Sequence, residues 1–151
     1  MDFEINLEKL LSEKNVVVGL DVGDKTIGVS VSDARLKIAS GVTTLIRKCE
    51  DAKRLLKTLS QYKIGTFVVG WPIQMNGIEG SQCEKVQKFI DELKSQTSVS
   101  IVKWDERFST CVVDSVLIEA NVSRKRRKQY VDKIAAVYIL QGALDYLNRA
   151  K

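Results

Sequence analysis

Histidine is absent from this chain of 151 residues, and its absence excludes several kinds of enzyme. Without an imidazole the chain cannot form a Ser-His-Asp or Cys-His catalytic set, and most zinc sites lose their commonest ligand. Any hydrolytic chemistry therefore has to use carboxylates, lysines, hydroxyls or hard metal ions.

Cysteines and long apolar runs are also scarce. The three cysteines, Cys49, Cys83 and Cys111, form no Cys-x-x-Cys pair. We expect reduced, buried or half-buried thiols, as in a cytoplasmic protein. The apolar runs are far shorter than the ~20 residues of a membrane helix, and residues 1–14 lack the apolar segment of a signal peptide. We therefore expect no membrane partner.

Proline occurs once, and the chain has no low-complexity tract that would mark a linker. We therefore expect one domain over residues 1–151, with residues 1–14 as a short N-terminal extension.

The positive charge is concentrated in one place. The net charge is +5, and residues 124–128 (RKRRK) supply five basic side chains in a row. The other 19 basic residues equal the 19 acidic residues in number. A local basic patch suits an anionic polymer such as nucleic acid, although a solvated loop between two helices would have the same composition.

The hydrophobic pattern divides the chain into short strands and helices. Strands are predicted at 15–21, 26–33, 38–46, 66–71 and 99–104. Helices are predicted within 4–13, at 50–62 and 81–95, from Ser109 or Thr110 to about residue 121, and at 131–149. Strict alternation in 26–33 indicates a half-buried strand, and Gly23 lies in a tight link that makes the first two strands a hairpin.

This order of elements predicts an α/β fold. The first three strands follow one another through tight links, which favours an antiparallel meander. Later strands alternate with helices, which requires parallel crossovers. A mixed β-sheet, with an antiparallel meander plus parallel strands and with helices on both faces, satisfies both patterns.

Asp21 is the first candidate functional residue, because it ends the most apolar strand. Ligands of open α/β sheets gather beyond the carboxyl ends of the strands. Gly19 and Gly23 flank Asp21, and we expect them to leave the backbone uncrowded enough for a phosphate or a metal ion to approach. The alternative is an aspartate that only forms the hairpin turn.

Two further acids occupy comparable positions. Glu106 follows the predicted strand 99–104, although an acid near a helix N-terminus is also favoured by the helix dipole. Asp132 shares a helical face with apolar residues, where an unpaired carboxylate is costly. It needs a salt bridge, a capping role or a metal ion. The apolar residues of this face are Ala135, Ala136, Ile139, Ala143 and Leu147, and the two adjacent alanines would let the helix approach a sheet closely.

Three converging carboxylates in a chain without histidine suggest a site for Mg²⁺ or Mn²⁺. Such ions activate water and stabilise the leaving oxygen when a phosphodiester is cut. The basic run 124–128 would then bind the phosphates of the substrate.

The chain resembles the YqgF family, described as Holliday-junction resolvases and as pre-16S rRNA nucleases, over most of its length from about Val16 to Leu147. Four blocks carry the resemblance. They are 19–23 (GLDVG) with 27–33 (IGVSVSD), 69–72 (VGWP) with 75–77 (MNG), 105–110 (DERFST), and 131–136 (VDKIAA) with 139–141 (ILQ). DxG hairpins recur widely, so the order and separation of all four blocks give the resemblance its strength.

The resemblance implies an RNase H-like fold and a metal-dependent nuclease that matures the 5′ end of pre-16S rRNA in a bacterial cytoplasm. It places the family's acids on Asp21, Glu106 and Asp132. Candidate nucleic-acid contacts are Lys25, Arg107, Arg124, Lys125, Arg126, Arg127 and Lys128, although for Arg107 we favour a salt bridge with a carboxylate.

Two residues depart from the family pattern. Asp24 stands where an uncharged residue is usual, and we expect it to cap the hairpin rather than to join a metal shell. Trp71 stands before Pro72 where a smaller apolar residue is common. For Trp71 and Trp104 we expect packing rather than stacking on bases.

Three other functions compete with rRNA processing. A Holliday-junction resolvase would use the same chemistry on branched DNA and should be a homodimer, because it cuts two symmetric strands. A ribosome assembly factor would bind nucleic acid without catalysis and would tolerate loss of the acids. A sugar-kinase or actin-like ATPase needs a second domain and a second glycine-rich loop, which this chain lacks. The sequence is compatible with a monomer or a homodimer.

Overall fold

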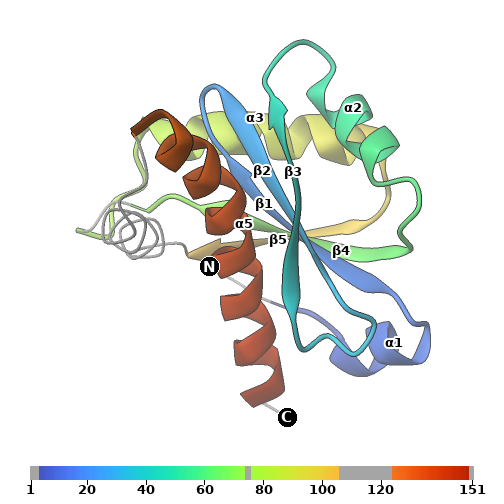
Figure 1. Ribbon diagram of the computed structural model, residues 1–151. Helices are drawn as coiled ribbons and strands as arrows, with labels where there is room; N and C mark the ends of the chain where they lie inside the picture. The colour runs from blue at the N-terminus through green and yellow to red at the C-terminus, as the bar shows by residue number, and fades with distance from the viewer. Residues whose placement is uncertain (1–3, 74–75, 106–123, 150–151) are drawn as a thin grey trace.

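The computed structural model describes residues 4–73, 76–105 and 124–149, and the side chains of the last helix from residue 134 onward (Figure 1). The described strands are β1 (Val16–Val22), β2 (Thr26–Ser32), β3 (Ala39–Ile46), β4 (Ile64–Trp71) and β5 (Ser100–Asp105). The described helices are α1 (Leu7–Ser12), α2 (Asp51–Thr58), α3 (Ser81–Gln96) and α5 (Arg124–Arg149). The predicted helix from Ser109 or Thr110 to about residue 121 lies outside these ranges, as does Cys111.

The five strands form one sheet in the order β3-β2-β1-β4-β5. β1 pairs antiparallel with β2, and β2 pairs antiparallel with β3. β4 pairs in parallel with β1 on one side and with β5 on the other. The predicted mixed sheet, a meander followed by parallel crossovers, is confirmed.

Helices cover both faces of this sheet, also as predicted. Figure 1 shows α5 crossing one face while α2 and α3 lie on the other. α2 and α3 bury residues such as Leu55 and Phe89 against one side of the strands. α5 and α1 bury residues such as Leu140 and Leu10 against the other. Because side chains alternate along a strand, Val18 and Leu20 of β1 face α2 and α3, whereas Val17 faces α5.

At Gly19 the helix α5 closely approaches the sheet. A Cβ atom at Gly19 would lie 2.5 Å from Ser30 Oγ, 2.7 Å from Leu140 Cβ and 3.0 Å from the carbonyl oxygen of Ala136. The expectation that Gly19 keeps the backbone open for a phosphate or a metal ion is therefore wrong, because the helix occupies that space. The prediction that small alanines allow a close helix approach is confirmed, since Ala135 and Ala136 are fully buried.

Ser30 explains why β2 differs from the predicted half-buried strand. Ile27, Val29 and Val31 are buried on one face, as expected. Ser30 on the other face is also buried, and its hydroxyl donates a hydrogen bond of 2.7 Å to the carbonyl of Ala136. Alternation of apolar and small polar residues indicated an exposed face here, but α5 covers it.

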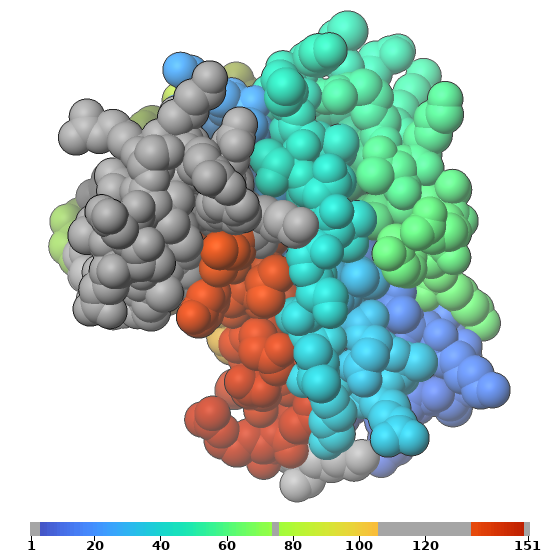
Figure 2. All heavy atoms as spheres, viewed as in Figure 1, coloured from blue at the N-terminus to red at the C-terminus, as the bar shows by residue number. Residues whose placement is uncertain are grey.

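The helix α5 runs antiparallel to β1. Ala136 contacts Gly19 in the middle of the strand, whereas Gln141 accepts a hydrogen bond of 2.9 Å from the amide of Ala39. Farther along the helix, Asn148 donates a hydrogen bond of 2.9 Å to the carbonyl of Leu36, which lies beyond the amino-terminal end of β1. The start of α5 therefore points toward the carboxyl end of β1. Figure 2 shows α5 and β3 side by side on the surface.

The first residues of α5 include the basic run. The helix was predicted from Val131, but it begins at Arg124, so residues 124–128 belong to its first turns rather than to a loop before it. No helix in the described part of the chain is long and apolar enough to span a membrane.

Substitution of Gly19 by alanine tests the helix contact. Because the new methyl group meets the Ala136 carbonyl and the Leu140 side chain, we expect Gly19→Ala to lower the free energy of unfolding by about 1–3 kcal/mol. Urea denaturation followed by circular dichroism measures the change.

Gly142→Ala is the matched control, because its Cβ would meet Trp104 at an ordinary contact distance of 3.4 Å. An alanine inside a helix also gains up to about 1 kcal/mol over glycine. The same loss of stability in both variants would show that close packing at Gly19 is not the cause.

Candidate active site

Asp21 lies at the carboxyl end of β1, on the face that α5 covers. It follows Val17 and Gly19 at two-residue intervals, and both of these residues face α5. Asp21 is half-buried and pairs across the hairpin with Gly28 of β2, which adds no side chain beside it. Its carboxylate oxygens are ligands that hard divalent ions prefer, so the donor chemistry of Asp21 fits a magnesium or manganese ion.

The carboxyl ends of β1, β4 and β5 meet at this edge of the sheet. Leu20 of β1 pairs with Val69 of β4, and the last residues of β4 pair with the last residues of β5. Trp71, which belongs to the core under α2 and α3, is the partner of Asp105. Asp105 is therefore on the opposite face of the sheet from Asp21.

The other two predicted acids are less completely described. Asp132 belongs to α5 and precedes Ala136 by one helical turn, so its backbone lies toward the carboxyl end of β1, as does Asp21. Its side chain is outside the described part. Glu106 and Arg107 lie outside the described residues, directly after β5 in the sequence. Within the described residues, no three acidic or cysteine side chains gather closely enough to hold a metal ion.

The hairpin turn that follows Asp21 is tied to α3. Lys85 of α3 forms an ion pair of 3.0 Å with Asp24, and Gln82 donates 3.4 Å to the same carboxylate. The hydrogen bond from Lys85 lowers the pKa of Asp24 below its usual value of 3.8. The expectation that Asp24 caps the hairpin is therefore wrong, because its side chain reaches across to a helix. Lys25, the next residue, is exposed at the tip of the turn.

Arg47 also contacts the hairpin turn, and the sequence analysis missed it. It directly follows β3, and its backbone amide donates a hydrogen bond of 2.8 Å to the carbonyl of Lys25. Its side chain donates a hydrogen bond of 2.7 Å to the carbonyl of Gly23 and another of 2.9 Å to the carboxylate of Asp51. No sequence motif marks Arg47, since one arginine after a strand is common and its partners are far along the chain.

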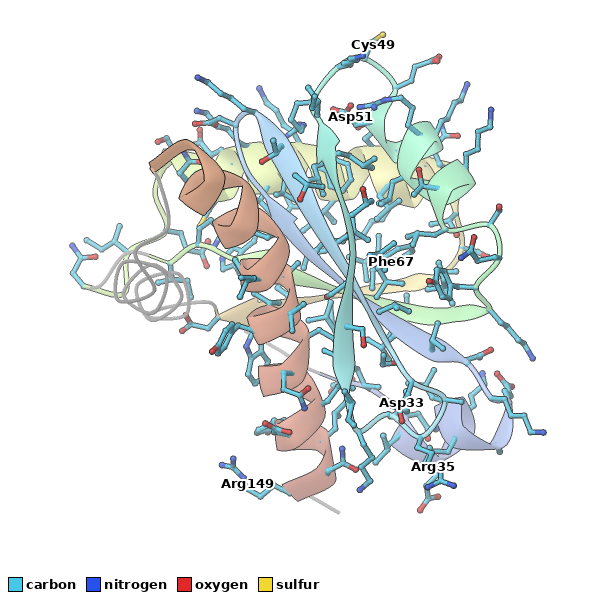
Figure 3. The ribbon with its side chains drawn as sticks, in the orientation of Figure 1. Asp33, Arg35, Cys49, Asp51, Phe67 and Arg149 are labelled. Atoms are coloured by element: carbon cyan, nitrogen blue, oxygen red, sulfur yellow. The ribbon has the colours of Figure 1, made fainter. Side chains whose placement is uncertain are left out.

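Asp51, at the start of α2, is the buried centre of this cluster, and Figure 3 labels it at the top of the view. Its carboxylate accepts from Arg54, from the amide of Lys48 and from Arg47. Burial alone raises the pKa of Asp51, but these hydrogen bonds outweigh that effect, and the pKa lies below the usual value of 3.8. The side chain is only 5% exposed, so it is screened little by solvent.

The tryptophans and cysteines were assigned packing roles. Trp71 is 3% exposed, which confirms that expectation, and Lys103 lies over its ring at 3.9 Å. Trp104 is partly buried against α5, where its ring is 5.8 Å from that of Tyr146. Cys83 is buried as expected, whereas Cys49 is exposed, so the expectation for Cys49 is wrong. Figure 3 shows Cys49 at the tip of the link between β3 and α2.

Comparison with known sequences places these features in one family. A sequence model of the family described as RuvX, Holliday junction resolvase, matches residues 15–146. Relatives named "Putative pre-16S rRNA nuclease" are similar to the chain. The one from Clostridium botulinum is 44% identical over 135 residues, which is 88% of this chain and 98% of the relative. The one from Thermoanaerobacter pseudethanolicus is 47% identical over 132 residues, 85% of this chain and 95% of the relative.

Solved structures resemble the fold at low sequence identity. Thermus thermophilus RuvC in complex with a Holliday junction substrate has a TM-score of 0.52 and 12% identity, and the match covers 88% of this chain and 96% of RuvC. A second Thermus thermophilus RuvC structure has a TM-score of 0.50 and 13% identity with the same coverage. The expected RNase H-like fold is confirmed. Residues 1–14, which include α1, precede the family match.

The low pKa of Asp51 gives a prediction for acid stability. An aspartate with a lowered folded-state pKa stabilises the fold when the pH is above the unfolded-state pKa, and this stabilisation is lost as the pH falls through the folded-state pKa. Between about pH 5 and pH 3 we therefore expect the free energy of unfolding to fall more steeply in the wild type than in Asp51→Asn. Urea denaturation across this range measures both slopes. Parallel pH curves would contradict the assignment.

Proposed function

The chain belongs to the RuvX (YqgF) family, and on that premise we propose that it is a metal-dependent nuclease that processes the 5′ end of pre-16S rRNA. The observation that carries the proposal is the position of Asp21. It ends β1 on the face covered by α5, and the backbone of Asp132 lies toward the same end of that strand. A bacterial cytoplasm is where the chain would meet such a substrate.

The metal-binding residues in this proposal are Asp21, Glu106 and Asp132. Their carboxylates would hold Mg²⁺ or Mn²⁺, which supplies an activated water and stabilises the charge that develops on the phosphate and the leaving oxygen. Asp21 is held by a central strand, so its backbone has little freedom. The closeness of α5 to Gly19 supports a role for Asp132, since the start of the same helix then lies near the same edge.

The face of the sheet distinguishes the two acids at the end of β5. Asp105 is on the side of Trp71 and of the core beneath α2 and α3, so it is a poor partner for Asp21. Because Asp105 faces away from Asp21, the proposal takes the next acid in the chain, Glu106, which the resemblance to the family also assigns. The proposal therefore assigns Glu106 to the metal and gives Asp105 no role there.

Nucleic-acid binding in this proposal depends on the basic residues around that edge. The run Arg124–Lys128 lies in the first turns of α5, which point toward the carboxyl end of β1. Lys25 is exposed at the hairpin tip next to the same edge. These side chains and Arg107 would contact phosphates, which gives affinity without sequence preference.

A Holliday-junction resolvase is the second candidate function. The description of the matched family favours it, and the fold of Thermus thermophilus RuvC is compatible with it. The names of the curated relatives favour pre-16S rRNA instead, at a higher identity and over most of both chains. The two functions share the chemistry at Asp21 and differ in substrate, and the resolvase also requires a symmetric dimer.

Substitution of Asp21 tests the proposed catalytic site. We expect Asp21→Asn to slow cleavage by roughly 100-fold or more, since a catalytic metal ion contributes several kcal/mol and each 1.4 kcal/mol is tenfold in rate. Cleavage of a pre-16S rRNA fragment and of a four-way DNA junction is measured with Mg²⁺ and with Mn²⁺.

Asp24→Asn is the matched control, because Asp24 is exposed and paired with Lys85, and we expect its cleavage rate to stay near that of the wild type. Undiminished cleavage by a folded Asp21→Asn variant would reject the site. Cleavage of the junction alone, by a dimer, would favour the resolvase.

Removal of basic charges from α5 tests the nucleic-acid interface. If both Arg126 and Arg127 contact phosphates, the double substitution to glutamine should weaken RNA binding and reduce the slope of log affinity against log salt by about 1.4–1.8. Fluorescence anisotropy at several salt concentrations measures that slope. The same double substitution at Lys53 and Lys57 of α2, on the other face of the sheet, should leave the slope unchanged. Equal effects of the two double variants would contradict a localised interface.

A further inference from the structure

Arg47 joins three parts of the fold through one side chain. Its Nε donates a hydrogen bond of 2.9 Å to Asp51 at the start of α2. One terminal nitrogen donates a hydrogen bond of 2.7 Å to the carbonyl of Gly23 in the β1–β2 turn. The guanidinium carbon lies 5.7 Å from the centre of the Phe89 ring of α3. The planar fork of an arginine can make such bonds in two directions at once.

The turn that Arg47 holds is not of the kind that stabilises itself. Two residues, Asp24 and Lys25, separate Gly23 from Thr26. The Gly23 amide donates a hydrogen bond of 2.8 Å to the carbonyl of Thr26. The favoured two-residue hairpin turns need a positive φ at their first central residue. Neither Asp24 nor Lys25 has a positive φ. Contacts from outside the hairpin therefore contribute to the conformation of this turn.

Arg47 supplies the better of these outside contacts. Its amide and its side chain bind the carbonyls of Lys25 and Gly23, on both sides of Asp24. Asp24 makes the other described contacts, a hydrogen bond from Gln82 and the ion pair with Lys85, in which both side chains are more than half exposed. Exposed ion pairs of this kind contribute little. The Arg47 side chain is 26% exposed and its partner Asp51 only 5%. The Arg47–Asp51 pair, which holds the guanidinium beside the turn, is therefore less screened by water than the Asp24–Lys85 pair.

Gly23 is only two residues beyond Asp21, so a shift of the turn moves the end of β1 and the carboxylate on it. Metal and catalytic groups need to be held to within roughly 0.5 Å. We propose that Arg47 is a positioning residue that fixes Asp21 for metal binding, by holding the Gly23 carbonyl while Asp51 and Phe89 hold the guanidinium. This inference deepens the proposed nuclease function and rests on it.

Asp51 also explains why Arg47 is assigned to positioning rather than to phosphate binding. Asp51 accepts a hydrogen bond from the Nε of Arg47 and the Gly23 carbonyl accepts one from a terminal nitrogen, so these two donors are not available to a phosphate. A second arginine, Arg54, binds the same carboxylate from the next turn of α2, and it also donates 2.6 Å to the carbonyl of Ile46. Its side chain is 34% exposed, similar to that of Arg47. Arg54 has no hydrogen bond to the β1–β2 turn among the described contacts.

The pair Arg47→Met and Arg54→Met therefore separates positioning from general stability. Each variant removes one arginine from Asp51, but only Arg47→Met releases the Gly23 carbonyl. Three quantities are measured on the full chain. They are the Mn²⁺ affinity by calorimetry, the hydrogen exchange rates of the amides in residues 21–26, and KM and kcat for the RNA fragment.

We expect Arg47→Met to weaken Mn²⁺ binding by about tenfold, the low end of what loss of an outer-shell partner costs. Exchange in residues 21–26 should become faster, and kcat should fall with little change in KM. Arg54→Met should lose comparable stability against urea while keeping Mn²⁺ affinity and turn exchange near those of the wild type.

The outcomes distinguish this inference from the proposed function. If the wild type binds Mn²⁺ and cleaves, but the two variants have equal Mn²⁺ affinity, Arg47 is not a positioning residue and the nuclease function stands. Unchanged exchange in residues 21–26 of Arg47→Met would also overturn the inference. If the wild type neither binds Mn²⁺ nor cleaves either substrate, the proposed function fails and the positioning role fails with it.

Discussion

The contact between α5 and the middle of the sheet sets the geometry on which the candidate site depends. Gly19 has no side chain, Ala136 is small, and Ser30 donates to the Ala136 carbonyl, so the helix backbone reaches the strand backbone directly. Because α5 runs antiparallel to β1, this contact brings the start of the helix toward the end of β1. The residues that permit the contact are ordinary core residues, and the proposed metal ligands Asp132 and Asp21 lie one helical turn and two strand residues away from them.

The second constraint acts from the other face of the sheet. The β1–β2 turn lies beyond Asp21 and has no positive φ to give it a self-stabilising geometry. Arg47 and Lys85 attach it to the helical layer formed by α2 and α3. Asp21 thus lies between two supports, with α5 packed beside its strand and a partly buried guanidinium–carboxylate cluster bonded to the turn after it. A strand end supported from both sides is well suited to hold a metal ligand.

Family membership and physical reasoning contribute different parts of the functional conclusion. The absence of histidine, three acids and a basic run already favoured metal-dependent chemistry on a nucleic acid. The names of the relatives and the description of the family support a nuclease and suggest the two substrates of the proposal. The face of the sheet adds a separate reason to set Asp105 aside, because it separates Asp105 from Asp21.

The sequence by itself determined the strands, most helices and the mixed parallel and antiparallel character of the sheet, because apolar periodicity and link length are local properties. It also predicted the close approach of α5 from its alanines. Only the tertiary structure decided that a helix occupies the space beside Gly19, that Asp24 pairs with Lys85, and that Arg47 bonds to the β1–β2 turn. These contacts join residues between 24 and more than 100 positions apart, and no local pattern encodes which distant partner a small or charged residue will meet.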